Sequence, residues 1–215
     1  MTSTTVEFYF DPVSPYAWLA IEQMDRIIEA GGHIVCRPIL FAALLNAYAT
    51  KGPAEVPAKR AYVFRDVMRQ AKQLNLLFRG PPCHPFNPLA ALRAIHAIED
   101  DAQRLVLARH LLKAVWCEGI DVADPDSLHA VVTRSGFDAD AVRTASASAE
   151  VKQRLRNVTQ GAIDIGVFGV PTFRLRDELF WGADRVDAVV WALKGGTIDE
   201  AFYASVLARP VAAER

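Results

Sequence analysis

Cysteine is scarce in this sequence. Cys36, Cys83 and Cys117 are the only three among 215 residues, and no two of them have Cys-X-X-Cys spacing. This small, odd set excludes a disulfide framework and is typical of proteins in a reducing compartment. The opening stretch MTSTTVEFYF lacks a basic region followed by an apolar core, so we expect no signal peptide. The sequence therefore predicts a cytoplasmic protein.

An excess of charge and long apolar runs are also missing. Lys and Arg together number 24, Asp and Glu number 25, and the formal net charge is -1. Because neutralising phosphates requires clustered Lys and Arg, we expect no nucleic-acid partner. No apolar run approaches the roughly 20 residues that span a bilayer, so we expect no membrane partner. HExxH is absent and neither His84 nor His96 has a second ligand at metal spacing, which predicts no metal site.

Hydrophobic residues are plentiful, at 52% of the chain, which is enough for the core of one large domain. The apolar and aromatic stretch 6–10 ends at Asp11-Pro12 and predicts a buried strand. Apolar residues then recur at helical spacing over about 15–30, and HIVCRPIL predicts a second strand. This strand–helix–strand order implies two parallel strands joined by a crossover helix.

The middle of the chain has mostly helical periods. We expect helices over about 57–76, 88–99, 102–117, 125–135, 138–145 and 149–165. Near the end, PTFRLRDELFWG predicts two short strands around a turn at 176–178, followed by a helix over about 184–193 and a short helical tail. The simplest interpretation is a small mixed α/β domain, residues 1–40 and 167–215, interrupted by an all-helical insertion, residues 41–166.

Ser14 stands between the first strand and the first helix. With Pro15 at the first helical position, the serine has the place of an N-cap, and capping is its plain interpretation. The start of a helix also offers free N–H groups, which stabilise a negatively charged sulfur. Without a partnering base, the Ser14 hydroxyl is a weak nucleophile but a good hydrogen-bond donor to such a sulfur on a ligand. A second feature, GVFGVPTF at 166–173, makes Val170-Pro171 a candidate cis peptide bond.

The motifs FYFD-x-x-SPY, GVFGVPTF and WGADR, on either side of the long helical middle, resemble one family over about residues 5–205. This is the glutathione-dependent branch of the DsbA-like thioredoxin superfamily, which holds the 2-hydroxychromene-2-carboxylate isomerases and the kappa-class glutathione transferases. The resemblance implies a thioredoxin-like fold of class α/β, with a large all-helical insertion between its βαβ and ββα halves. The stretch 14–17 then stands where DsbA-type proteins have Cys-X-X-Cys.

The resemblance also implies glutathione as the cofactor and suggests its contacts. Ser14 would hydrogen-bond the glutathione sulfur and hold it as a thiolate. Val170, with Pro171 in the cis form, would pair its backbone with the cysteinyl part of the tripeptide. Asp184 would meet the γ-glutamyl ammonium group, and Lys59 the glycyl carboxylate.

Other interpretations of these positions stay open. Lys59 lies on a basic helical segment that is more typical of a solvated face than of a binding site. Asn87 resembles an asparagine that borders the isomerases' substrate pocket, but it also suits a loop or a helix cap. Phe41 is a core residue by type, and it can line an apolar substrate cleft. Relatives often have a serine where Ala183 stands and an asparagine near Thr50-Lys51, so two contacts of the family are missing here.

The activity that the resemblance implies is cis-trans isomerisation of an unsaturated aromatic keto acid derived from a hydroxychromene carboxylate, as in the degradation of aromatic compounds. The partner is then a small aromatic carboxylate, and the relatives suggest a homodimer. A kappa-type transferase or peroxidase and a non-catalytic glutathione-binding protein remain alternatives. Ser14 and Ala17, in the places of two cysteines, argue against a protein disulfide oxidoreductase.

Overall fold

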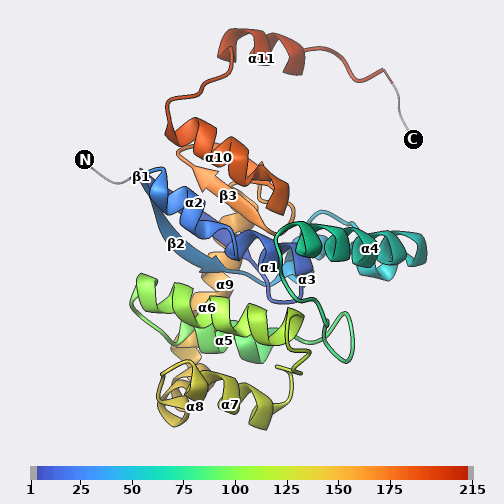
Figure 1. Ribbon diagram of the computed structural model, residues 1–215. Coiled ribbons are helices and arrows are strands. Elements are labelled where there is room, and N and C mark those ends of the chain that lie inside the picture. The colour runs from blue at the N-terminus through green and yellow to red at the C-terminus, as the bar shows by residue number, and fades with distance from the viewer. Residues whose placement is uncertain (1–3, 213–215) are drawn as a thin grey trace.

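Both ends of the chain contribute to one mixed sheet. The computed structural model describes residues 4–212, which form a four-stranded sheet in the order β2-β1-β3-β4 (Figure 1). The strands are β1 (Thr4–Phe10), β2 (Gly32–Pro38), β3 (Thr172–Leu175) and β4 (Glu178–Trp181). β1 is parallel to β2 and antiparallel to β3, which is antiparallel to β4. This arrangement confirms the thioredoxin-like α/β fold expected from the sequence.

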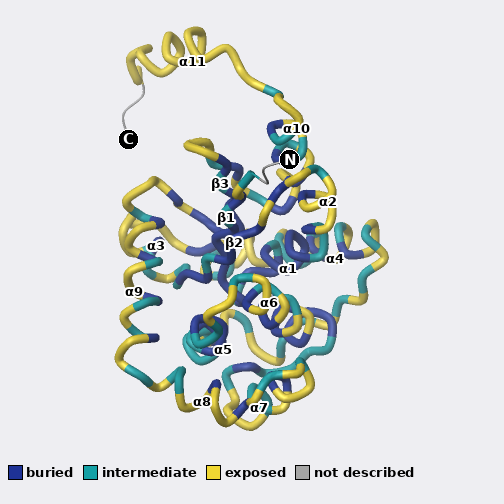
Figure 2. Tube along the Cα trace, turned by 90° about the vertical axis from the view of Figure 1, so that its left-hand side faces the viewer, coloured by how far each residue is buried: buried dark blue, intermediate teal, exposed yellow. Residues whose placement is uncertain are grey.

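The aromatic strand β1 is buried on both faces. Val6, Phe8 and Phe10 are fully buried on one face, where the rings of Phe8 and Phe10 stack at 4.8 Å between centroids. Tyr9 points to the other face, as the two-residue repeat of a strand requires. Figure 2 shows the sheet between two sets of helices. One set is α1 (Pro15–Ile21), α2 (Met24–Glu29) and α10 (Val186–Leu193), and the other is α3 (Phe41–Ala47) and α9 (Ala149–Asp164).

The stretch between α3 and α9 confirms the predicted helices, with ends that differ by up to three residues. Its helices are α4 (Pro57–Gln73), α5 (Leu89–His96), α6 (Asp101–Trp116), α7 (Pro125–Arg134) and α8 (Ala139–Ala147), after the 3-10 turn η1 (Pro53–Glu55). α6 is central, because Leu111, Leu112 and Trp116 on it are fully buried. α9 packs against β2 as well as against α5 and α8. The division into residues 1–40 with 167–215 and an insertion 41–166 stays a prediction.

Two local features differ from the sequence-based expectation. Residues 15–30 form two helices, α1 and α2, instead of one. The Nε2 atom of Gln23 donates to the Leu19 carbonyl (3.0 Å), while the Gln23 backbone N–H donates to the Ala20 carbonyl (3.0 Å). The side chain thus takes the carbonyl that this N–H would bond in a continuous helix, and the helix breaks there. α3 was not expected because seven residues are too few to show a helical period.

The end of the chain adds a 3-10 turn, η2 (Ala183–Arg185), before α10 and a last helix, α11 (Glu200–Leu207), after it. Within residues 4–212, no helix has both the length and the apolar character needed to cross a membrane. The same residues hold no group of three His, Cys, Asp or Glu side chains placed to bind a metal ion.

Candidate active site

A large cleft lies beside the N-terminal end of α1. Its volume is about 1060 Å³, and its walls come from segments 11–16, 40–55 and 84–88, from one side of α4, and from the turns at 168–171 and 181–185. Ser14, Val170, Pro171 and Asp184, which were singled out in the sequence, all line this cleft, and so does Phe41. The fold therefore brings the segment that starts α1 and the segments around β3 and β4 together at one cavity.

Ser14 is both the cap of α1 and part of the cleft wall. Its backbone is extended, and its Oγ accepts a hydrogen bond from the Ala17 N–H (3.3 Å). The same hydroxyl donates to the Val170 carbonyl, also at 3.3 Å. Both distances exceed the usual 2.5–3.2 Å, so the hydroxyl is held loosely enough to turn toward a ligand. The capping role predicted from the sequence is confirmed, and it leaves the O–H available.

The turn that carries Val170 is fixed on either side. The Val170-Pro171 peptide bond is cis, as the sequence suggested. The Thr172 hydroxyl donates to the Gly169 carbonyl (2.7 Å), and the Trp181 ring packs so closely on Gly169 that a Cβ there would lie 2.5 Å from its Nε1. Within the described residues, the Val170 N–H has no hydrogen-bond partner. A rigid turn thus presents an unpaired backbone donor in the cleft.

Asp184 is attached to the same wall through the turn after β4. The Gly182 N–H donates to the Pro171 carbonyl (2.9 Å), and Gly182 has a φ of 119°, a conformation that glycine adopts without strain. A Cβ at Gly182 would lie 2.4 Å from the Asp184 Oδ1. The Asp184 carboxylate forms an ion pair with the neighbouring Arg185 (2.7 Å), and both side chains are exposed. The site thus offers a carboxylate and a guanidinium side by side.

Asp11, which the sequence reading treated only as the end of a strand, is a fully buried acid in the cleft wall. Its Oδ1 accepts from the Val13 N–H and its Oδ2 from the Phe41 N–H, each at 2.9 Å. Burial raises the pKa of Asp11 to about 7, although both hydrogen bonds oppose this rise. The signal in the sequence was an acid between an aromatic strand and a capping serine. Asp11 joins the α1 start to the start of α3.

Aromatic side chains form much of the cleft. The Tyr16 hydroxyl donates to Asp66 (2.8 Å), which also accepts from Gln70 (2.8 Å). Burial, and then the hydrogen bond to Asp66, raises the pKa of Tyr16 well above its usual value. The rings of Phe168 and Trp181 meet edge to face with centroids 4.9 Å apart. Further aromatic side chains in the lining are Phe41, Tyr48, Tyr62 and Phe86.

Lys59 and Asn87 lie outside the cleft wall. Within the described residues, the lining includes Lys51 but not Lys59, which is exposed on α4. Asn87 is also exposed, and its Oδ1 accepts from the Leu89 N–H (3.0 Å) at the start of α5. Lys51 was not predicted as a site residue, because the sequence drew attention to positions 50–51 only as the place where relatives have an asparagine.

The cysteines are not placed for dithiol chemistry. Among residues 4–212, no cysteine lines the cleft, and the position three residues after Ser14 is the buried Ala17. Burial raises the pKa of the Cys36 thiol to about 12 and that of the Cys117 thiol to about 11. Cys83 is exposed. A Cys-X-X-Cys exchange centre is therefore absent from this part of the described chain.

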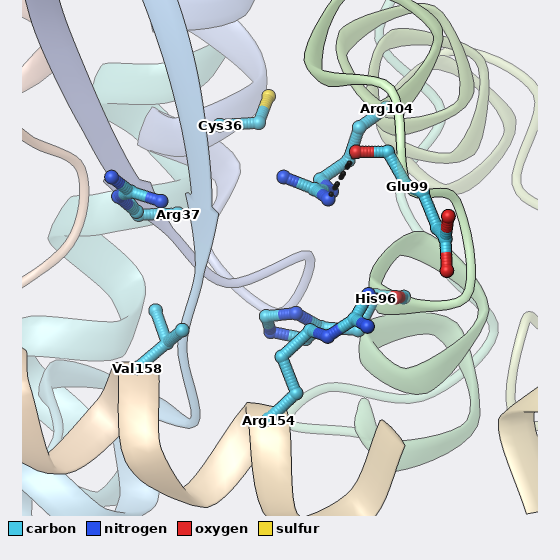
Figure 3. A pocket seen from close by; sticks show the side chains of 7 residues that line it. All are labelled: Cys36, Arg37, His96, Glu99, Arg104, Arg154 and Val158. Carbon is cyan, nitrogen blue, oxygen red and sulfur yellow. Dashed lines mark hydrogen bonds between the residues drawn. The ribbon is translucent and has the colours of Figure 1, made fainter. Parts of the chain in front are cut away.

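A second cavity, of about 270 Å³, is lined by Cys36, Arg37, His96, Glu99, Arg104, Arg154 and Val158 (Figure 3). Its guanidinium groups already bond the protein. Arg104 donates to the carbonyls of Ile98 and Glu99 (2.9 Å each), and Arg154 donates to the carbonyl of His96 (3.0 Å). Burial, followed by the nearby arginines, lowers the pKa of His96 to about 4. These contacts tie the end of α5 to α6 and α9.

Comparison with known proteins identifies the family that shares this fold. A family model described as a DSBA-like thioredoxin domain matches residues 5–194. The 2-hydroxychromene-2-carboxylate isomerase of Sphingobium xenophagum is 31% identical over 189 residues, covering 85% of this chain and 94% of that protein. Glutathione S-transferase kappa 1 of Homo sapiens is 24% identical over 204 residues, covering 88% and 90%.

Solved structures show the same relationship. A structure of 2-hydroxychromene-2-carboxylate isomerase superimposes with a TM-score of 0.82 at 27% identity, covering 95% of this chain and all of that one. A probable DsbA oxidoreductase of Streptomyces coelicolor has a TM-score of 0.71 at 18% identity, covering 98% and 94%, and thus shares the fold. The chain therefore belongs to the DSBA-like thioredoxin family, within the group formed by the 2-hydroxychromene-2-carboxylate isomerases and the kappa-class glutathione transferases.

Proposed function

We propose that this protein is a glutathione-dependent cis-trans isomerase acting on an aromatic hydroxychromene carboxylate. The observation that carries the proposal is the meeting of Ser14 and Val170, 156 residues apart, in one cleft. There, the loosely bound hydroxyl of Ser14, at the start of α1, lies beside the turn that carries the unpaired N–H of Val170. A tripeptide can bond such a backbone in the manner of a strand, with its thiol directed at the hydroxyl.

Glutathione, when bound, would supply a thiolate that adds reversibly to the unsaturated substrate. The residues of the chain set its protonation and position. Ser14 turns its O–H from the Val170 carbonyl to the sulfur. Lowering a thiol pKa by two pH units requires about 2.7 kcal/mol. One hydrogen bond to a charged group contributes about 1.5–3 kcal/mol, and the positive end of the α1 dipole adds up to about 2 kcal/mol, so together they are sufficient.

The rest of the cleft suits a charged tripeptide and an aromatic acid. Val170 offers the cysteinyl part its N–H and C=O, and Asp184 faces the γ-glutamyl ammonium once its pair with Arg185 opens. For the glycyl carboxylate we propose Lys59, and Lys51 as the alternative because it lines the cleft. The aromatic wall around Phe41 is suited to a planar aromatic substrate. Asn87 stays a proposed substrate contact that would require its loop to turn.

The test compares two serine caps. Ser14→Ala and Ser148→Ala each remove an N-cap, because the Ser148 Oγ accepts from the Val151 N–H (3.1 Å) at the start of α9. Each should cost about 1 kcal/mol of stability. Only Ser14→Ala should abolish the ultraviolet thiolate signal of bound glutathione at neutral pH and reduce isomerase turnover. Turnover that survives in Ser14→Ala would remove Ser14 from the mechanism.

A second candidate is a kappa-type glutathione transferase or peroxidase. It is favoured by the 24% identity to Glutathione S-transferase kappa 1 of Homo sapiens. The two reactions differ in stoichiometry, because an isomerase returns the thiol and a transferase or peroxidase consumes it. Free thiol measured during turnover separates them. Glutathione binding without any turnover would instead leave a non-catalytic binding protein.

A further inference from the structure

The smaller cavity, of about 270 Å³ beside the outer strand β2, carries more positive than negative charge. Within the described residues, the lining of this β2 cavity has three arginines, Arg37, Arg104 and Arg154, but a single acid, Glu99. Figure 3 shows the Glu99 carboxylate directed away from the Arg104 guanidinium. The acids that form ion pairs with these arginines lie outside the lining; they are Glu7, Asp101 and Glu150. The β2 cavity is therefore suited to an anion.

The other polar side chains of the β2 cavity leave this excess charge in place. The Nε2 atom of His96 donates to the Pro38 carbonyl (2.8 Å). Burial, and then the charges of the three arginines, lower the pKa of His96 to about 4, so all three guanidinium groups act on the same ring. Burial also raises the pKa of the Cys36 thiol to about 12, so this side chain adds no negative charge near neutral pH.

The guanidinium groups have hydrogen-bond donors that the protein does not use. Each guanidinium has five N–H groups. Within the described residues, Arg154 donates through only two nitrogens, to the His96 carbonyl (3.0 Å) and to Glu150 (3.0 Å). Arg37 donates only through Nε, to Glu7 (2.8 Å). Most of the N–H groups of both arginines thus remain for the acceptor oxygens of a ligand.

Arg104 is the most deeply placed of the three arginines, since it is only 8% exposed. Its Nε and Nη2 donate to the carbonyls of Ile98 and Glu99 (2.9 Å each), and its Nη1 to Asp101. These bonds fix the guanidinium, which Figure 3 shows directed toward β2. A charge fixed in this way at the back of the cavity attracts an anion without having to move.

The outer edge of β2 adds a backbone donor. Alternate residues of a strand direct their backbone groups to opposite edges. The Ile39 N–H donates to the Phe10 carbonyl on β1 (2.9 Å), whereas the Pro38 carbonyl accepts from His96 on the outer edge. Cys36 precedes Pro38 by two residues, so its N–H is on the outer edge too, and within the described residues it has no partner. Because Cys36 is 1% exposed and lines the cavity, this donor is buried and calls for an acceptor.

We propose that the β2 cavity binds a phosphate group, either as free phosphate or as part of a small metabolite. A phosphate dianion has acceptor oxygens on all sides, which match donors on β2, α6 and α9, whereas a carboxylate has only two in one plane. At about 30 Å³ for each non-hydrogen atom, the cavity holds roughly nine atoms, enough for a phosphate and a short carbon chain. Within residues 4–212, no residue lines both this cavity and the large cleft, so the proposal does not depend on glutathione chemistry.

The experiment is calorimetric titration of the full chain with sodium phosphate at pH 7.5, with sodium chloride keeping the ionic strength constant. Arg154→Gln and Arg37→Gln, on different elements, should each raise the dissociation constant by about tenfold or more. The matched control is Arg156→Gln on the same helix as Arg154, because Arg156 bonds Gln153 (3.1 Å) and is not part of the lining. A second control, Arg185→Gln, removes a guanidinium from the large cleft. Both controls should bind phosphate as the wild type does.

The amide signal of Cys36 in a proton–nitrogen NMR spectrum gives a readout that loss of stability does not imitate. It should shift as phosphate is added to the wild type and to Arg156→Gln, and stay in place in Arg154→Gln. Glycerol 3-phosphate is the second probe. Tighter binding of glycerol 3-phosphate would support a phosphate ester as the ligand, and tighter binding of phosphate would support the free ion.

Three results would overturn the proposal. The first is a titration with phosphate that matches one with chloride at the same ionic strength. The second is unchanged affinity in both Arg154→Gln and Arg37→Gln. The third is affinity that is lost in Arg185→Gln and kept in Arg154→Gln, which would place the phosphate in the large cleft.

Discussion

Replacing Asp11 by Asn should change how the stability of this protein depends on pH. Asp11 is fully buried, and its pKa is raised from an ordinary 3.8 to about 7. The folded state therefore holds a proton between these values that the unfolded state has lost. The contribution of Asp11 to stability is then largest below about pH 4 and is lost as the pH rises through 7. At about 1.4 kcal/mol for each pH unit, the difference corresponds to about 4 kcal/mol.

Asp11→Asn also lowers the free energy of unfolding by an amount that does not depend on pH. Asparagine keeps one oxygen for the N–H groups of Val13 and Phe41 and turns its NH₂ toward the other. One buried donor then loses its partner, at about 1–3 kcal/mol. Asp11→Asn should thus be the less stable protein near pH 4. It should equal or exceed the wild type near pH 8, where the wild type buries a charge.

The assay is urea unfolding of both proteins across this pH range, and the quantity of interest is the difference between them. His96 acts with the opposite sign, because its pKa is lowered to about 4 and stability is lost as the pH falls below 6.5. The contributions of Asp11 and His96 therefore oppose each other in the wild-type curve, whereas the difference between the two proteins isolates Asp11. A difference that stays constant from pH 4 to pH 8 would refute the reasoning.

Three further experiments, with four substitutions between them, test the packing. Gly169→Ala should lower glutathione affinity in calorimetric titration, because the added Cβ would meet the indole ring of Trp181. Adding Trp181→Leu to the same chain should restore part of that affinity. An unchanged affinity in Gly169→Ala would show that the turn can move to accommodate the Cβ. Trp116→Phe should cost about 2–3 kcal/mol in urea unfolding, because the buried Pro12 carbonyl loses its donor (3.0 Å). An unchanged midpoint would mean that water replaces the bond. Arg104→Gln should speed hydrogen exchange at the end of α5 and not in α1, and equal effects on both would contradict a local role.

Much of the fold was predictable because its elements have strong periods. The strand that ends at Asp11-Pro12 and the helices of the middle segment bury regular apolar positions, and these survive in the structure. The break at Gln23 could not be predicted, because it depends on one side chain competing with the backbone for the Leu19 carbonyl. The cis bond between His84 and Pro85 carried no signal that separates it from other X-Pro bonds.

The candidate site was predictable where a motif fixes the backbone. Ser14 and Val170 stand at a helix start and at a turn before a strand, and both positions follow from local sequence. Contacts made by long side chains were harder to predict, because the path of the backbone between two lysines determines which of them faces the cavity. Lys51 and Lys59 are eight residues apart, and only Lys51 is among the side chains that line the cleft in the described residues. In the sequence, Asp11 marked only the end of a strand, whereas in the structure it is a buried acid.

The antiparallel pairing of β1 with β3 has a consequence for how the protein is made. The serine leaves the ribosome early, but its partner turn is synthesised 156 residues later. A nascent or prematurely ended chain can complete its first strand and helix and still lack the turn that would complete the proposed glutathione site. If glutathione binds there as proposed, it can stabilise only chains that have been synthesised through the turn at 168–171 and beyond, and not the shorter ones.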